Sequence, residues 1–166
     1  MTETEKVDLK KYCLVLYVTY AISAALQVFD DMDLLCLSIL TLAIAGHLCK
    51  KKKAVAQGTI YASHLAWLYR TAWIASCVAI PVNLGLTAGL IWMFTDLGSI
   101  VNQVMSGDVD AITSGAQSYM AANMGKIALF NAIGAAPPTI WWLHRCWRGY
   151  LYLKANMAID HVKSWR

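Results

Sequence analysis

Charged residues are scarce in this sequence, and four long stretches lack them entirely. Only 14% of the 166 residues are Asp, Glu, Lys or Arg, and 58% are hydrophobic. Soluble domains carry roughly 25% charged residues, and their surface helices carry polar residues in every second turn. The composition therefore argues against a soluble domain. The uncharged stretches are residues 12–29, 34–49, 71–94 and 127–143.

Each of these stretches is about as long as a membrane-crossing helix. Such a helix needs about 17–25 predominantly apolar residues, so 34–49 lies at the lower limit. No convincing cleavage site follows the first stretch, which we expect to act as an uncleaved insertion signal. The sequence predicts an all-α polytopic membrane protein, a single membrane domain with four transmembrane helices.

The few charges are distributed unevenly along the chain. All Lys and Arg residues except Lys126 fall in the N-terminus, the connection 50–70 or the tail 144–166, whereas six of the ten acids fall in the other connections. The positive-inside rule places the basic segments in the cytoplasm. We therefore expect both termini in the cytoplasm of a bacterium, the protein in its inner membrane, and residues 95–126 outside. The net charge of +4 follows from this topology, so we expect no nucleic-acid partner.

Recognisable catalytic patterns are also lacking. The four stretches contain no Asp, Glu, Lys or Arg, which excludes an intramembrane carboxylate site, and no GxSxG, HExxH or P-loop pattern occurs. An enzyme would have to use His64, Arg70 and Arg145 near the cytoplasmic surface. We therefore expect no catalytic residues and no cofactor.

The five cysteines form no CxxC pair, so no disulfide framework is expected. One zinc arrangement is open: His47-x-Cys49 and His144-x-Cys146 end two of the stretches, and His64 is nearby in the topology. Two imidazoles and two thiolates would suit tetrahedral zinc. H-x-C is not a standard ligand spacing, however, and a helical cysteine often serves as a small hydrophobic residue. We expect no metal site.

Tryptophans and basic residues gather at the predicted cytoplasmic interface. A Trp belt with Lys and Arg flanks is typical of any inner interface, and a pocket for an anionic lipid is the alternative. In SHLAWLYRTAW, residues 63–73, His64, Trp67 and Arg70 step by three and form one stripe of a helix. We expect this stripe to dock on the Arg145–Arg148 end of the last stretch, with Arg70 stacking on a Trp ring.

Polar and small residues inside the apolar stretches indicate helix packing. Pro81 predicts a kink, and Asn83, near the middle of its stretch, needs a partner from another helix. Gly85 and Gly89 are spaced for close helix approach. Asn131 is a second amide in the apolar core, and both amides would be required in a transporter.

The connection 95–126 contains an amphipathic pattern. Apolar residues recur at helical spacing, which predicts a helix over 95–106 lying in the outer interface or covering the bundle. Residues 107–126 are either a loop or an early start of the last helix, and residues 150–163 predict an interfacial helix on the cytoplasmic face. The apolar positions of the first pattern are Leu97, Ile100, Val101, Val104 and Met105.

Two segments resemble a known family. GTIYASHLAWLYRTAW, Gly58 to Trp73, resembles the G-T-x-x-x-S-H-x-x-W-x-x-R-T-x-W signature of small bacterial four-helix membrane proteins. Those proteins are related to the twenty-kilodalton subunit of the chloroplast inner-envelope protein translocon. The run Trp141–Leu153 resembles their second signature, an aromatic run followed by R-x-x-R-G, here Arg145, Arg148 and Gly149.

The resemblance implies a four-helix inner-membrane protein and little about function. The bacterial members are largely uncharacterised, and the protein-conducting role of the chloroplast relative does not transfer with the fold. This chain also departs from the pattern, because Ala62 stands where an acidic residue is usual and the segment 95–126 is longer.

The sequence favours a non-catalytic subunit or accessory factor of a membrane complex, in contact with the bilayer and with other membrane protein chains. We expect two surfaces to meet the partner: the helix face that carries Gly85 and Gly89, and the external segment 95–126 with Leu97, Ile100, Val101 and Val104. A small transporter or channel component acting as an oligomer is the first alternative. An anionic-lipid-binding module or a membrane-bound enzyme is the second.

Overall fold

The computed structural model describes residues 2–29 and 32–160, and within these ranges the chain is helical with no strand. The predicted all-α class is confirmed. The elements in chain order are α1 (Glu3–Leu26), α2 (Met32–Val55), α3 (Ile60–Ile74), the π-helical turn η1 (Ala75–Ala79), α4 (Ile80–Phe94), α5 (Gly98–Ser106) and α6 (Val109–Lys154).

Three helical stretches are long and apolar enough to cross a membrane. They are Glu3–Leu26, Asp33–Val55 and Ile60–Phe94, and the last combines α3, η1 and α4. The expected fourth span, residues 127–143, lies inside the 46-residue helix α6, which is not one of these three.

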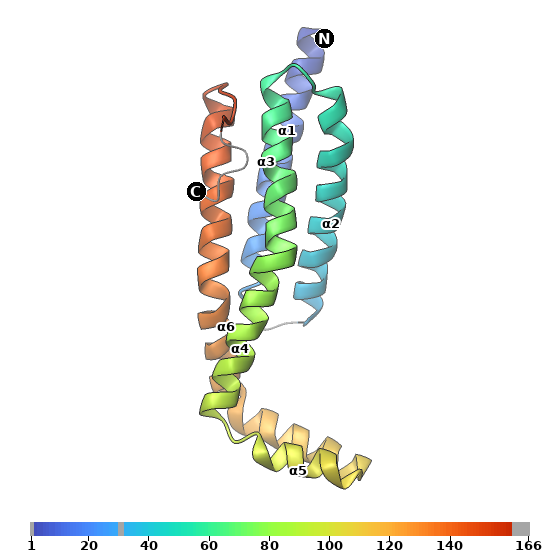
Figure 1. The fold of residues 1–166 in the computed structure, drawn as a ribbon, viewed down its shortest axis with the longest axis vertical. Helices are drawn as coiled ribbons and strands as arrows, with labels where there is room; N and C mark the ends of the chain where they lie inside the picture. Colours follow the sequence, from blue (N-terminus) through green and yellow to red (C-terminus); the bar gives the residue numbers. More distant parts are fainter. Residues whose placement is uncertain (1, 30–31, 161–166) are drawn as a thin grey trace.

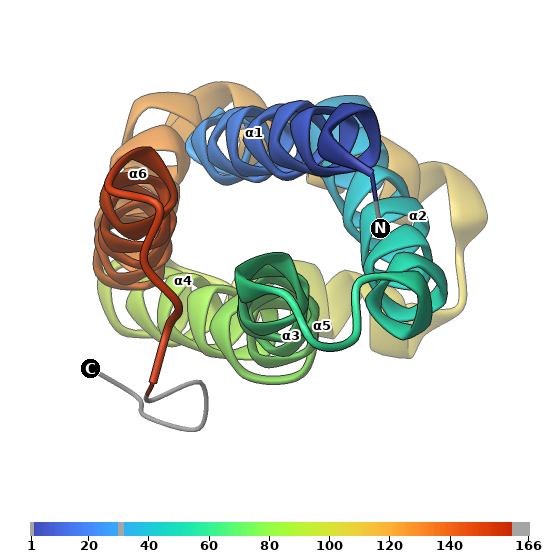
Figure 2. The same ribbon diagram turned by 90° about the horizontal axis from the view of Figure 1, so that it is seen from above.

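The helices form an elongated bundle with an arm, residues 95–126, at one end (Figure 1). Viewed along the bundle, α1, α2, α3 and α6 surround one centre (Figure 2). Contacts join α1 to α2, α3 and α6, join α2 to α3, and join α4 to α6. The largest fully buried side chains at the centre include Tyr20, Leu42, Leu65 and Trp142.

Large apolar side chains also cover the outside of the bundle. Val15, Ile22, Leu40 and Trp92 are each more than half exposed. Soluble monomers rarely expose contiguous apolar surface on this scale. Such an outer surface suits contact with lipid tails.

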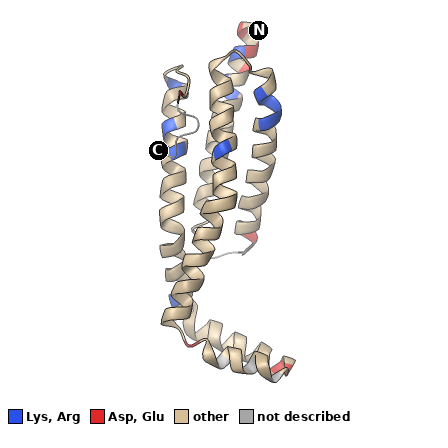
Figure 3. Cartoon of the chain, viewed as in Figure 1, with Lys and Arg blue, Asp and Glu red and all other residues tan. Residues whose placement is uncertain are grey.

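Figure 3 shows Lys and Arg gathered toward the end of the bundle that carries the N-terminus. Asp and Glu residues lie in the first turns of α1, in the first turn of α2 and at both ends of the arm, and Asp160 lies in the tail. The folded chain therefore keeps the separation of charge that the sequence shows.

The helices extend beyond the predicted stretches. α3 begins at Ile60, well before the expected residue 71, because an uncharged stretch marks the apolar part of a helix and not its first hydrogen-bonded turn. Residues 109–126 form the early part of α6 and not a loop. The left-handed Gly107 ends α5, and the Asp108 side chain accepts hydrogen bonds from the backbone N–H groups of residues 110 and 111, so α6 begins there.

The predicted interfacial helix over 150–163 is wrong beyond Lys154. α6 ends there, Asn156 adopts a left-handed backbone (φ 53°), and the chain folds back. The Ile159 backbone N–H donates to Ser63 Oγ at 2.9 Å, and the Ile159 side chain is buried. Hydrogen bonds with α3 thus replace the helical ones. Residues 161–163 of the predicted helix lie outside the described residues.

The predicted disturbance at Pro81 takes the form of η1. Proline lacks a backbone N–H, and its ring clashes with the carbonyl four residues earlier, at Cys77. The wider π-helical turn Ala75–Ala79 includes that carbonyl and lets the chain pass the proline within one continuous helical run.

Candidate functional site

Trp67 and Arg145 form the central contact between α3 and α6. The Arg145 guanidinium carbon lies 3.6 Å from the centre of the Trp67 ring, and Trp67 Nε1 donates to the Arg145 carbonyl oxygen at 3.2 Å. Arg145 is fully buried and Trp67 is 3% exposed. The two residues are therefore joined by two contacts: a cation–π stack between their side chains, and a hydrogen bond from the Trp67 indole to the Arg145 backbone.

Thr71 extends this contact. Arg145 Nε donates to Thr71 Oγ1 at 3.1 Å, and Thr71 Oγ1 donates to the Trp67 carbonyl at 2.8 Å. The Trp141 ring centre lies 5.3 Å from the guanidinium carbon. Arginine keeps its charge in proteins, so the aromatic faces and the hydroxyl stabilise a buried cation.

The stacked arginine is Arg145 and not Arg70. Position 71, four residues after Trp67, shares its helix face better than position 70 does. Arg70 is half-buried, and among the described residues its Nε is buried without a hydrogen bond. Arg148, one turn beyond Arg145, is also half-buried.

His64 joins α1 to the C-terminal tail. Tyr17 Oη lies 2.9 Å from His64 Nδ1, and His64 Nε2 lies 3.0 Å from the Met157 carbonyl oxygen. A carbonyl only accepts, so Nε2 carries the proton, and in the neutral imidazole Nδ1 accepts from Tyr17. His64 is fully buried, which removes it from solvent and from any substrate in solution.

We expect Tyr17→Phe to lower the free energy of unfolding by about 1–3 kcal/mol, because it leaves a buried imidazole nitrogen without its donor. Thermal unfolding in detergent measures the effect. Tyr12→Phe is the matched control, since the buried Tyr12 hydroxyl makes no hydrogen bond within the described chain. Equal shifts for the two variants would contradict the assigned bond.

The two His-x-Cys ends do not form a zinc site. Cys49 and Cys146 are buried, whereas His47 and His144 are exposed. Two residues rotate a helix by about 200°, so the members of each pair point to opposite sides. No group of three or more His, Cys, Asp or Glu is placed to hold a metal within residues 2–29 and 32–160. His64 bonds to Tyr17 and Met157 instead.

Within the chain, the close helix approaches involve glycines other than Gly85 and Gly89, whose exposed face of α4 stays a predicted contact with a partner helix. A Cβ at Gly85 or Gly89 would meet nothing within 4 Å. A Cβ at Gly149 would lie 2.4 Å from Tyr17 Oη, and one at Gly134 would lie 2.5 Å from Thr87 Oγ1. Spacing alone does not show which face of a helix is inside. Gly149 does fall in the R-x-x-R-G run, which was the available signal.

The two predicted amides occupy different environments. Asn83 is 3% exposed, and its Oδ1 accepts from Thr87 Oγ1 at 3.3 Å within α4. A Cβ at Gly134 would lie 3.1 Å from both Asn83 Oδ1 and the Asn83 carbonyl, so this amide packs against α6. Asn131 is half-buried.

The amphipathic residues of the outer connection lie on α5 and just before it. Leu97 and Ile100 are half-buried, whereas Val101, Val104 and Met105 are exposed. α5 packs on α6, and Figure 1 shows it lying beside the first turns of that helix. This arrangement leaves an apolar face uncovered within the chain.

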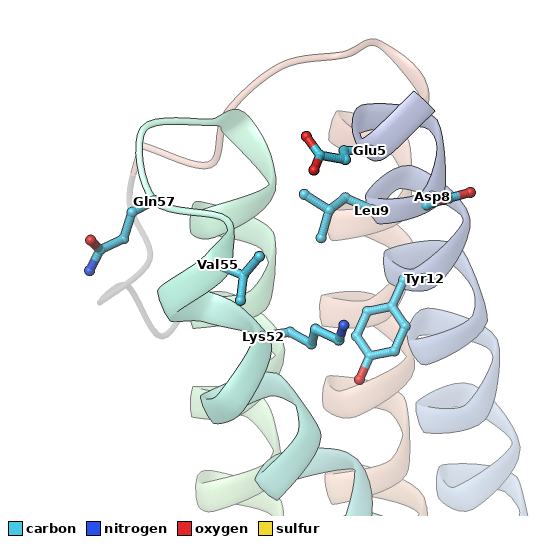
Figure 4. A pocket seen from close by; sticks show the side chains of 7 residues that line it. All are labelled: Glu5, Asp8, Leu9, Tyr12, Lys52, Val55 and Gln57. Atoms are coloured by element: carbon cyan, nitrogen blue, oxygen red, sulfur yellow. The ribbon is translucent and has the colours of Figure 1, made fainter. Parts of the chain in front are cut away.

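A pocket of about 610 Å³ lies between the start of α1 and the end of α2. Figure 4 shows Glu5, Lys52 and Tyr12 bordering the space, whereas the Asp8 and Gln57 side chains point away from it. The Lys52 ammonium is 5.9 Å from the centre of the Tyr12 ring. The pocket contains none of the predicted site residues, and no histidine, cysteine or serine lines it.

Comparison with models of known protein families, with curated proteins and with solved structures finds no match to this chain. The family resemblance therefore rests on the two signatures alone. In the fold these signatures are neighbours, because Trp67 belongs to the first and Arg145 to the second.

Proposed function

We propose that this chain is a four-span protein of a bacterial inner membrane, with both termini in the cytoplasm, and that it acts as a non-catalytic subunit or accessory factor of a membrane complex. The three apolar helical stretches support membrane insertion, and residues 127–143 of α6 would be the fourth span. The gathering of Lys and Arg at one end supports the orientation (Figure 3). The two signatures support kinship with the translocon-related family.

The observation that carries the proposal is the external arm, residues 95–126. It projects from the bundle at the acidic end (Figure 1). Its exposed large apolar residues are Val101, Val104, Met105, Val109, Met120 and Met124. Exposed apolar patches mark protein or membrane interaction sites, and methionine suits adaptable binding surfaces. A partner chain would cover this face.

The buried contacts around Arg145 support a structural role for that region. Of the three residues that an enzyme would have to use, His64 and Arg145 are fully buried and Arg70 is half-buried. The hydrogen bonds of His64 and Arg145 run between α1, α3, α6 and the tail. Polar groups arranged in this way hold helices together.

Co-purification in mild detergent tests the proposal. The native chain should bring down a stoichiometric membrane partner, and Val104→Asn combined with Met105→Asn should reduce its recovery about tenfold or more, because apolar contacts at the centre of an interface contribute about 1–2 kcal/mol each. Quantitative mass spectrometry of the purified material measures the recovery.

The matched control is Val55→Asn combined with Met157→Asn, a Val–Met pair at the opposite end in which both side chains are also more than half exposed. This control should keep the partner. Purification of the native chain as a clean monomer would sink the subunit proposal. If the purified chain instead formed a homo-oligomer that conducted a solute, and Asn83→Leu or Asn131→Leu abolished the flux, the transporter alternative would replace it.

A further inference from the structure

A continuous groove runs between α1 and α6 on the outside of the bundle. It consists of two adjoining hollows of about 340 and 550 Å³, which share Leu14 and Tyr150. We call it the α1–α6 groove. Its remaining lining residues are Val7, Lys10, Lys11, Tyr17, Val18, Ala21, Leu143, Cys146, Trp147, Leu153 and Lys154.

Both hollows are lined mostly by apolar atoms, and they differ in charge, because one end carries lysines whose aliphatic stems form part of its wall. Lys10, Lys11 and Lys154 line the end near the N-terminus, and among the residues that the structure describes no carboxylate lines either hollow. Lys10 Nζ donates to Asn156 Oδ1 at 2.8 Å, which holds one of these cations in place. The other end is lined by aliphatic and aromatic side chains, with the Trp147 and Tyr150 rings 5.7 Å apart along one wall.

The floor of the groove belongs to the core. Tyr17 and Cys146 line it and are only 3% and 4% exposed. The walls, by contrast, include the exposed Leu14, Val18 and Trp147. A long thin apolar molecule could therefore lie between the two helices with contacts on three sides.

The length of the groove matches one leaflet of a bilayer. From Val7 to Ala21 the α1 wall covers about 21 Å at the helical rise of 1.5 Å per residue. Half of a bilayer with its headgroup region measures about 20–22 Å. In the proposed orientation the lysines lie at cytoplasmic headgroup level and the apolar end reaches toward the midplane.

We propose that the α1–α6 groove binds one acidic phospholipid of the inner leaflet. Its phosphate lies among Lys10, Lys11 and Lys154, and one acyl chain occupies the apolar hollow beside Val18 and Ala21. Lysines at the membrane surface attract anionic headgroups. The inference rests on the proposed membrane insertion, and it assigns the lipid to residues other than Arg70, Arg145 and Arg148.

Native mass spectrometry of the full chain in detergent, titrated with phosphatidylglycerol, tests this site. Lys10→Gln, Lys11→Gln and Lys154→Gln in one variant should weaken binding about a hundredfold, since each lysine near a membrane surface contributes about 1 kcal/mol, or about fivefold. Ala21→Phe should weaken it separately by filling the apolar hollow. The matched control changes Lys50, Lys51 and Lys53, three exposed lysines on α2, to Gln and should bind as the native chain does.

Three results would overturn the proposal: equal weakening by both triple variants, equally tight binding of phosphatidylcholine, or displacement of the lipid by soluble glycerol phosphate at comparable concentration. The last would identify a phosphate site without an acyl chain. Resistance of the chain to alkaline carbonate extraction from cell membranes tests insertion by itself. Failure of the lipid site is thereby distinguished from failure of the proposed membrane function.

Discussion

Arg145→Ala is expected to lower the free energy of unfolding by about 3–5 kcal/mol, the cost typical of emptying a large buried site. The variant loses the stack on Trp67, the charged hydrogen bond to Thr71 and the packing of a fully buried side chain. The unfolding midpoint in detergent should fall by roughly 10 °C. Loss of the monodisperse peak in size-exclusion chromatography after heating measures it.

Two further substitutions separate packing from charge at this position. Arg145→Met keeps much of the volume and removes a buried cation, so it should cost clearly less than alanine. Arg145→Lys should restore little of the lost stability, because an ammonium group does not reproduce the planar stack. Arg148→Ala is the control at a half-buried arginine one turn away and should cost under about 1 kcal/mol. Equal losses at both arginines would contradict the central role of Arg145.

Gly149→Ala is expected to lower the free energy of unfolding by about 1–3 kcal/mol, or to displace Tyr17 from His64. The added methyl overpacks the contact between α1 and α6, and overpacking forces side chains out of place. The added methyl would lie 2.4–2.6 Å from three atoms of the Tyr17 side chain. Thermal unfolding in detergent measures the loss. Combination with Tyr17→Leu should make the glycine change nearly neutral, since the colliding ring is then gone.

Gly89→Ala is the matched control for this change. No described part of the chain lies within 4 Å of the added methyl, and alanine favours a helix by about 0.5–1 kcal/mol over glycine. The isolated chain should therefore be unchanged or slightly stabilised. A loss of stability in Gly89→Ala that matched the loss in Gly149→Ala would show that the Tyr17 contact is not the cause.

The helices were predictable from the sequence because stretches without charge have a simple physical meaning in a membrane protein. Their ends were not, since backbone hydrogen bonding continues into polar residues such as those of α3 before residue 71 and of α6 before residue 127. The contact between the 63–73 stripe and the Arg145 region follows from helix order and membrane depth. Which arginine stacks depends on small rotations of α3 and α6, and these are decided by packing.

The His64 contacts show another limit of sequence reasoning. Its partner in the tail is the Met157 backbone carbonyl. Every residue type has this oxygen, whatever its side chain. Nothing at position 157 could therefore signal the bond. The glycine case is similar, because the spacing of Gly85 and Gly89 is as regular as any packing motif, yet that face of α4 is exposed.

The bond between His64 and Met157 also bears on the order in which the chain is assembled during translation. The two residues are 93 positions apart, so α1, α2 and α3 are synthesised well before the tail that completes the contact. Until Met157 is synthesised, His64 Nε2 lacks its carbonyl partner. The folded-back tail is therefore the last segment to join the bundle, after the helices that it contacts have been synthesised.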